Sequence, residues 1–219
     1  MPKHLQNDLE KLKKKLFELC AMVEENMMFA IKSLTDKDIK QAERAQERDV
    51  DINNMEIEVE EDCLKIFALY QPVAIDLRFI VSVLKINYDL ERIGDLAANI
   101  AKRSIHVISI NNPVPDFNFT NMYEKSMKML KNSLDALVEF NTEKANDVIK
   151  SDDEIDDLNR QMFDVFKVEV IKNPQSVEFM LQYLSISRHL ERIADHAVNI
   201  SEDIIYMIDG EIVRHKKSN

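Results

Sequence analysis

The sequence predicts an all-α fold in which six long helices form two three-helix bundles. Three observations support this: glycine is nearly absent, apolar residues recur every three or four positions, and one segment is repeated. The chain has 219 residues but only two glycines, Gly94 and Gly210, and five prolines. Because tight β-turns depend on residues that tolerate positive φ, such a chain can form few hairpins. Long helices are the natural alternative.

Apolar stripes with helical spacing mark three helices in the first half of the chain. Leu9–Leu34 carries one stripe and Ile52–Tyr70 carries a second. Pro72 should end the second helix, because its ring blocks the hydrogen bond to the preceding turn. A third helix is expected from about Ala74 to about Ser109.

Three more helices are predicted in the second half. Met127–Leu137 and Ile155–Val165 carry the stripes of a fourth and a fifth helix. A sixth helix should run from about Asn173 to about Asp209. Short connections between long helices make neighbouring helices antiparallel, so the pattern favours bundles.

Several residues have the character of helix caps. Thr35 and Asp38 resemble a capping box, in which a hydroxyl accepts an otherwise unpaired backbone N–H. Asn173 and Pro174 have the order of an N-cap and a first helical position. Gly210 lies where a helix C-terminus favours a left-handed residue.

The third and sixth predicted helices repeat one another. Residues 79–100 and 179–200 are identical at eleven of 22 positions, with an offset of 100 and no gaps. Shared helical composition explains matching leucines and isoleucines, but it does not explain a polar run that occurs twice. A weaker match joins residues 49–53 to residues 152–156. A duplicated three-helix unit is the economical interpretation, and the two halves should be related by a pseudo-twofold axis.

The repeat divides the chain into two predicted domains. We expect a first three-helix repeat at residues 1–109, a linker at residues 110–117 and a second repeat at residues 118–219. The linker is marked by two asparagines and two prolines. The second repeat ends in a basic tail, which begins at Arg214 and is expected to be frayed.

Composition narrows the classes of partner and compartment. The net charge of −11 makes nucleic acid an unfavourable direct partner, because phosphate backbones repel such a surface. The N-terminus lacks the apolar stretch of a signal peptide, and no apolar run is long enough to span a bilayer, so a cytoplasmic location is expected. Cys20 and Cys63 lie among apolar residues and are expected to be reduced core residues.

Two sets of acidic residues form the candidate site. Glu91 and Asp95 lie one helical turn apart, and Glu191 and Asp195 repeat the arrangement. Two acids at this spacing repel each other, and a shared cation would relieve the repulsion with oxygen ligands suited to hard ions. Partner motifs lie on the preceding helix of each half. The predicted metal ligands are Asp49, Asn53, Glu91, Asp95, Asp152, Asp156, Glu191 and Asp195.

Other interpretations of these acids stay open. Arg92 and Arg192 lie next to them and could simply pair with them, and most helical acids are solvated surface charge. Repetition in register favours a metal-linked or anion-linked role, since surface charge has no reason to repeat. The histidines make no paired ligand spacing, and His196 is expected to be a half-exposed helical residue or a ligand. No nucleophile and base pair can be argued, so no enzyme activity is expected.

The sequence resembles the PhoU family over its whole length. The run Gln71-Pro-Val-Ala-Ile-Asp-Leu-Arg-Phe-Ile, joined to Leu90-Glu-Arg-Ile-Gly-Asp, is similar to the family signature. Leu190-Glu-Arg-Ile-Ala-Asp is similar to its second copy. Two departures are small: Ala194 replaces a frequent glycine, and Asn53 replaces an acid, which leaves the first-half site one charge poorer.

The resemblance implies a fold, a cofactor and partners. The fold would be PhoU-like, with two spectrin-repeat-like three-helix bundles. The acidic faces would hold divalent or trivalent metal clusters, with iron or zinc foremost and manganese, magnesium, nickel or calcium as alternatives. The partners would be the ATPase of a phosphate-specific ABC transporter and a phosphate-sensing histidine kinase. The protein would form a homodimer and meet the membrane only through its partners.

The resulting functional hypothesis is a negative regulator of the phosphate-starvation response. Such an adaptor would couple the transporter to the kinase, contribute to phosphate homeostasis and control phosphate uptake. One alternative is a metal-binding helical bundle with an enzymatic or metal-storage role. Another is a plain helical scaffold whose acids are all solvated.

Overall fold

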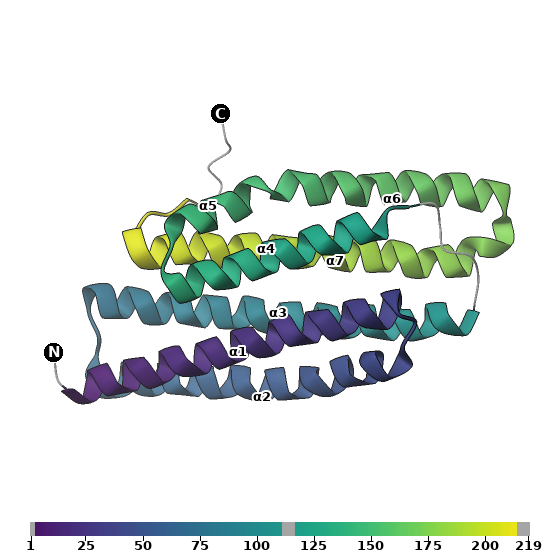
Figure 1. Cartoon of the computed structure of the whole chain (residues 1–219). Coiled ribbons are helices and arrows are strands. Elements are labelled where there is room, and N and C mark those ends of the chain that lie inside the picture. The colour runs from purple at the N-terminus through teal and green to yellow at the C-terminus, as the bar shows by residue number, and fades with distance from the viewer. Residues whose placement is uncertain (1–2, 111–116, 214–219) are drawn as a thin grey trace.

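The computed structural model describes residues 3–110 and 117–213, and every regular element within them is helical. The elements are α1 (Lys3–Thr35), α2 (Ile39–Tyr70), α3 (Ala74–Ile110), α4 (Phe119–Glu139), α5 (Thr142–Lys150), α6 (Asp152–Lys172), the 3₁₀ turn η1 (Pro174–Ser176) and α7 (Val177–Asp209). The predicted all-α fold is confirmed (Figure 1). No helix in these residues is both long and apolar enough to cross a bilayer.

The first three helices end close to the predicted positions. Helix α2 stops at Tyr70, and Gln71 adopts the left-handed conformation with φ of 44° before Pro72. Helix α3 then covers the predicted third helix. The proline signal was sufficient here, because a proline inside a helix removes one backbone hydrogen bond and its ring clashes with the preceding turn.

Helix α6 covers the predicted fifth helix, but a short helix that the sequence did not predict, α5, precedes it. Ser151 separates α5 from α6, and its hydroxyl donates to the carbonyls of Asp147 and Val148 at 2.8 and 2.9 Å. Back-bonding by serine competes with the regular helical bonds and bends the chain. Asp152, Asp153 and Glu154 then form the first turn of α6, where acidic side chains are favoured by the helix dipole.

The cap predictions were correct at Gly210 but needed revision at two other places. Gly210 follows α7 with φ of 75°, as expected. Thr35 is the last residue of α1 rather than a cap, and Asp38 alone caps α2 by accepting the backbone N–H of Lys40 at 2.9 Å. Asn173 and Pro174 are the N-cap and the first residue of the short 3₁₀ turn η1, as their order predicted, but this turn precedes α7 and the Asn173 side chain makes no cap hydrogen bond.

The helices pack as two groups that meet along a main seam between α3 and α7 and along a smaller contact between α1 and α4. Helices α1, α2 and α3 contact one another, as do α4, α5, α6 and α7. Helices α3 and α7 lie side by side and antiparallel between the groups, which is the arrangement a twofold axis between them requires (Figure 1). The predicted linker residues 111–116 and the tail from Arg214 lie outside the described residues. The domain limits therefore stay a prediction.

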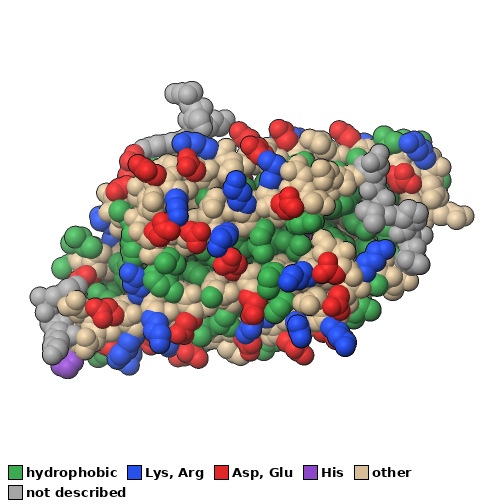
Figure 2. Space-filling model, in the orientation of Figure 1, with side chains coloured by type: hydrophobic (Ala, Val, Ile, Leu, Met, Phe, Trp, Pro, Cys, Tyr) green, Lys and Arg blue, Asp and Glu red, His purple; other side chains and the backbone are tan. Residues whose placement is uncertain are grey.

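The core follows the apolar stripes. Leu16, Val23 and Met27 of α1 are fully or almost fully buried, and each such side chain contributes about 1.5–3 kcal/mol on leaving water. Cys20 and Cys63 are buried free thiols, and burial raises the pKa of each to about 12. They are core residues, as predicted. On the face drawn in Figure 2, acidic and basic side chains are interspersed around apolar ones that gather where the groups meet.

One arginine joins the beginning of α3 to the end of α7. Arg78 donates from Nε to the carbonyl of Met207 at 3.1 Å and from Nη2 to the carbonyl of Ile208 at 3.2 Å. These carbonyls belong to the last turn of α7, which has no internal partners for them. A Cβ at Gly210 would lie only 2.7 Å from Nη1 of Arg78. Glycine is therefore required both for the turn and for the space that the guanidinium occupies.

Replacing Gly210 by alanine should destabilise the protein. The left-handed conformation costs a residue with a Cβ about 1–2 kcal/mol, and the displaced Arg78 adds to that loss. We expect the melting temperature, measured by circular dichroism, to fall by about 2–4 °C per kcal/mol. In an Arg78→Ala background the same change should cost less, because the clash is absent. Equal costs in both backgrounds would contradict the role assigned to Arg78.

Candidate functional site

The first-half acids lie on facing surfaces of α2 and α3. Burial and the nearby charge of Asp95 raise the pKa of Asp49. Burial and the charges of Asp95, Glu56 and Asp49 raise the pKa of Glu91, against the opposing effect of Arg92. The Oδ1 atoms of Asp49 and Asn53 are buried without a hydrogen-bond partner. The structure thus brings the predicted first-half residues together, and the negative charges of Asp49, Glu91 and Asp95 repel one another there.

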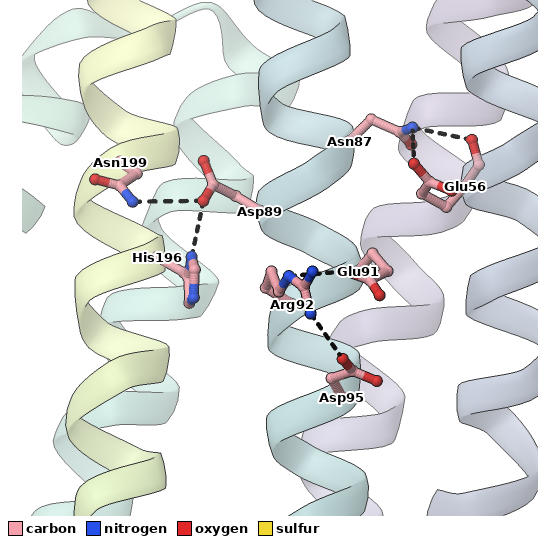
Figure 3. Close-up of polar contacts among 8 residues, drawn as sticks. All are labelled: Glu56, Asn87, Asp89, Glu91, Arg92, Asp95, His196 and Asn199. Carbon is pink, nitrogen blue, oxygen red and sulfur yellow. Dashed lines mark hydrogen bonds and ion pairs between the residues drawn. The ribbon is translucent and has the colours of Figure 1, made fainter.

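Arg92 offsets part of this charge. Its Nε lies 3.4 Å from Glu91, and its Nη1 lies 3.2 Å from Asp95 (Figure 3). The interpretation in which arginine pairs with the acids is therefore correct for these two residues. Asp49 is not included in those pairs, so an acidic oxygen without a partner remains on the opposite helix.

The second-half acids form a similar cluster between α6 and α7. Burial and the charge of Asp195, with smaller effects from Asp156 and other acids, raise the pKa of Asp152 to about 6. Burial and the charges of Asp195 and Asp156 raise the pKa of Glu191. Desolvation and the charge of Asp156 raise the pKa of Asp195, although its side chain is still exposed at the surface. Among the described residues no ion pair joins Arg192 to these acids.

The residue types in these two acidic sets suit a bound cation, but their side chains do not converge on one point in this structure. Half-buried carboxylates that raise one another's pKa, with unpaired oxygens beside them, are suited to a hard or borderline metal ion. In the described part of the chain, however, no group of three or more His, Cys, Asp or Glu side chains converges to hold one. Metal binding stays a prediction for all eight residues.

Each half has a polar pair next to its acids that the sequence reasoning missed. Asn87 donates to the backbone carbonyl of Glu56 at 2.9 Å and to its carboxylate at 3.3 Å (Figure 3). In the second half, Ser187 donates to Asn159 at 2.8 Å. Positions 87 and 187 correspond in the repeat, but one is asparagine and the other serine. From the sequence, only the offset of 100 residues between the repeats could have shown that positions 87 and 187 are equivalent.

A second polar cluster lies on the seam between α3 and α7. Nδ1 of His196 lies 2.8 Å from Oδ1 of Asp89, and Asn199 donates to the same oxygen at 3.4 Å (Figure 3). The side chain of His196 is only 14% exposed, so the expectation of a half-exposed histidine was wrong. Lys85 lies 3.4 Å from Asp203 farther along the seam. Sequence reasoning missed this cluster, because its partners are more than 100 residues apart.

Stability should fall as the pH rises through the range in which Asp152 ionises. Its folded pKa of about 6 lies above the ordinary value of 3.8, so the folded state binds the proton more tightly than the unfolded state. The stabilisation of the folded state that protonated Asp152 provides is complete below about pH 4, and it is lost as the pH rises past about 6. Asp152→Asn should therefore raise the melting temperature at pH 7, on the order of 2–4 °C.

The matched control for this prediction is Asp153→Asn, which removes the same charge from an exposed neighbour in the same helical turn. It should change the melting temperature at pH 7 by no more than about 1 °C. Equal effects of the two substitutions would contradict the assignment, since they would reflect overall charge or the helix dipole.

Comparison with known proteins agrees with this architecture. A family model described as the PhoU domain matches residues 16–104 and 119–204. The phosphate-specific transport system accessory protein PhoU homolog of Clostridium acetobutylicum is 35% identical, over 96% of this chain and 97% of that protein. The homolog of Pseudomonas putida is 34% identical, over 95% of this chain and 82% of that protein.

Solved structures support the same relationship. The crystal structure of PhoU from Pseudomonas aeruginosa superposes with a TM-score of 0.91 and 32% identity, covering 94% of this chain and 99% of that one. The phosphate transport system regulatory protein PhoU from Streptococcus pneumoniae superposes with a TM-score of 0.84 and 31% identity, covering 95% and 99%. The chain therefore belongs to the PhoU family.

Proposed function

We propose that this chain is a negative regulator of the phosphate-starvation response and an accessory protein of phosphate transport. The main support for the proposal is that the PhoU domain model matches both halves of the chain, at residues 16–104 and 119–204. Relatives of which it covers 97% and 96% are named as phosphate-specific transport system accessory protein PhoU homologs. The finer part of the proposal is an adaptor that joins the ATPase of a phosphate ABC transporter to a phosphate-sensing histidine kinase.

The outer surface of α2 supports an adaptor role. Val50, Ile57 and Leu64 are spaced by seven residues and are 60%, 51% and 55% exposed. Residues with this spacing lie along one line of a helix, so they form an apolar stripe. Exposed apolar side chains in one line are typical of surfaces that bind a partner. Homodimer formation and a cytoplasmic location are parts of the same proposal that oligomer and fractionation measurements would test.

The proposal assigns the acidic sets a metal-binding role. The eight predicted residues would hold clusters of iron or zinc, with manganese, magnesium, nickel or calcium as alternatives. Support comes from the unpaired oxygens of Asp49 and Asn53 and from the raised pKa of Asp152. A bound cation would supply the positive charge that these carboxylates lack. No described residues favour an enzymatic or storage role over a regulatory one, and the expected lack of catalysis stays a prediction.

Metal binding can be tested by elemental analysis and thermal unfolding. Protein purified without chelator should contain bound metal, and adding the metal at about 100 times its Kd should stabilise the fold by about 2.7 kcal/mol. The double variant Asp95→Asn plus Asp195→Asn should lose both the metal and this stabilisation. Its helicity and melting temperature without metal serve as the control. Wild-type protein that contains no metal and is not stabilised by any of these ions would refute the site.

The regulatory function can be tested with a phosphate-starvation reporter. Cells that lack this protein and grow in excess phosphate should show high alkaline phosphatase activity, because the repressing input is missing. Restoring the gene should return the activity to its low level. Activity that stays low in the deletion strain would mean that the fold serves another purpose.

A further inference from the structure

A cavity of about 620 Å³ lies on the seam between α3 and α7, beside the pair formed by Asp89 and His196. Its volume is within the range of small-molecule sites. Both helices supply its walls, with Lys85 and Asp89 on α3 and with Glu202 and Asp203 on α7. None of the eight predicted metal ligands lines it, so it is separate from the acidic sets described above.

Asp89 offers one carboxylate oxygen to the cavity. Its side chain is only 9% exposed, and its Oδ1 lies 2.8 Å from Nδ1 of His196 and accepts from Asn199 at 3.4 Å. Figure 3 shows the second oxygen, Oδ2, directed away from both partners. Within the described residues no hydrogen bond or ion pair reaches Oδ2. A buried carboxylate oxygen without a donor is costly, and a ligand that carries donors would relieve this cost.

Lys85 shows which kind of cation the cavity accommodates. Its ammonium lies 3.4 Å from Oδ1 of Asp203, whose side chain is 2% exposed, and 5.3 Å from the ring centre of Tyr206. An ammonium in this place combines a buried carboxylate with an aromatic face, which attracts cations. Asp89 lies one turn farther along α3, roughly 6 Å along the helix axis. Among the described residues no ammonium is paired with it there.

The charges of the walls favour an organic cation. Asp89, Glu202 and Asp203 contribute three carboxylates, against the single ammonium of Lys85. Arg92 lies over the ring of a tyrosine in the wall, but it pairs with the acids of the first-half set. In the described part of the chain no three His, Cys, Asp or Glu side chains converge to hold a metal ion. An ammonium needs no such convergence, because it donates to one or two oxygens at a time.

We infer that this cavity binds a small aliphatic polyamine, of which one ammonium donates to Oδ2 of Asp89. A second ammonium would lie near Glu202, which follows Asn199 by one turn, roughly 4.5 Å along α7. The methylene chain between them would pack on Leu84 and the ring of Tyr88, as lysine stems do on apolar surfaces. Because Asp89 and Glu202 belong to different halves of the chain, the ligand would hold the two halves together across the seam.

The inference does not depend on the proposed regulatory function, because it concerns binding by the purified protein. The diamine putrescine is titrated by calorimetry into the full chain, with chelator present and at about 0.15 M salt. One saturable site per chain is expected. Asp89→Asn should weaken binding roughly tenfold or more, as expected for a lost hydrogen bond to a charged group. The asparagine still offers an oxygen to His196 and Asn199, so the variant should fold, which circular dichroism checks.

A second variant, Glu202→Gln, tests the contact with the other ammonium and should also weaken binding roughly tenfold. Its matched control is Glu178→Gln, which removes the same charge near the start of the same helix, where the side chain is 77% exposed. The control should leave the affinity unchanged. Butylamine has the same carbon chain with only one ammonium, so it should bind more weakly than putrescine by a similar factor.

Four results would overturn the inference. One is the absence of saturable binding at millimolar putrescine. Another is an equal loss of affinity in Glu178→Gln and Asp89→Asn, which would show a diffuse charge effect. The third is equally tight binding of butylamine or of capped lysine, which would assign the cavity to a single ammonium such as a lysine side chain. The fourth is binding that appears only when Arg214, Lys216 and Lys217 are replaced by glutamine, since the basic tail would then be the occupant.

Discussion

The packing of α3 against α7 is the constraint on which the rest of the structure depends. Each of these helices is buried on the side of its own bundle and also along the seam. A helix covered on two sides must be apolar over most of its circumference, and side chains such as Leu90, Ile93, Leu190 and Ile193 meet that requirement. The outer helices then cover the faces that remain, and polar groups on the seam must find partners across it.

The acidic clusters follow from this arrangement. Because α3 packs against α2 and α7 packs against α6, the acids on these faces lie near the acids of the neighbouring helix. Glu91 and Asp95 meet Asp49, and Glu191 and Asp195 meet Asp152. Their mutual repulsion contributes to the raised pKa values of these carboxyl groups, and perturbed pKa values are common at functional sites.

The two halves have diverged within a shared framework. In the first half Arg92 pairs with Glu91 and Asp95, and Asn53 replaces an acid. In the second half Asp156 supplies that acid, and its charge contributes to the raised pKa of Asp152. The second-half set therefore has one more carboxylate than the first, and the charges of Arg188 and Arg192 oppose the rise in the pKa of Glu191.

The sequence by itself determined the helices, their principal breaks and the duplication. These features have local causes. Pro72 follows the end of α2, and the scarcity of glycine disfavours hairpins. The spacing of apolar residues marks the buried face of each helix. The candidate acids were also found from the sequence, because their repetition in register is visible without coordinates. Only the tertiary structure decided which of these groups have partners. The pairs Asp89 with His196 and Arg78 with the end of α7 join segments more than 100 residues apart. No local pattern records such contacts, because they arise when two distant helices pack.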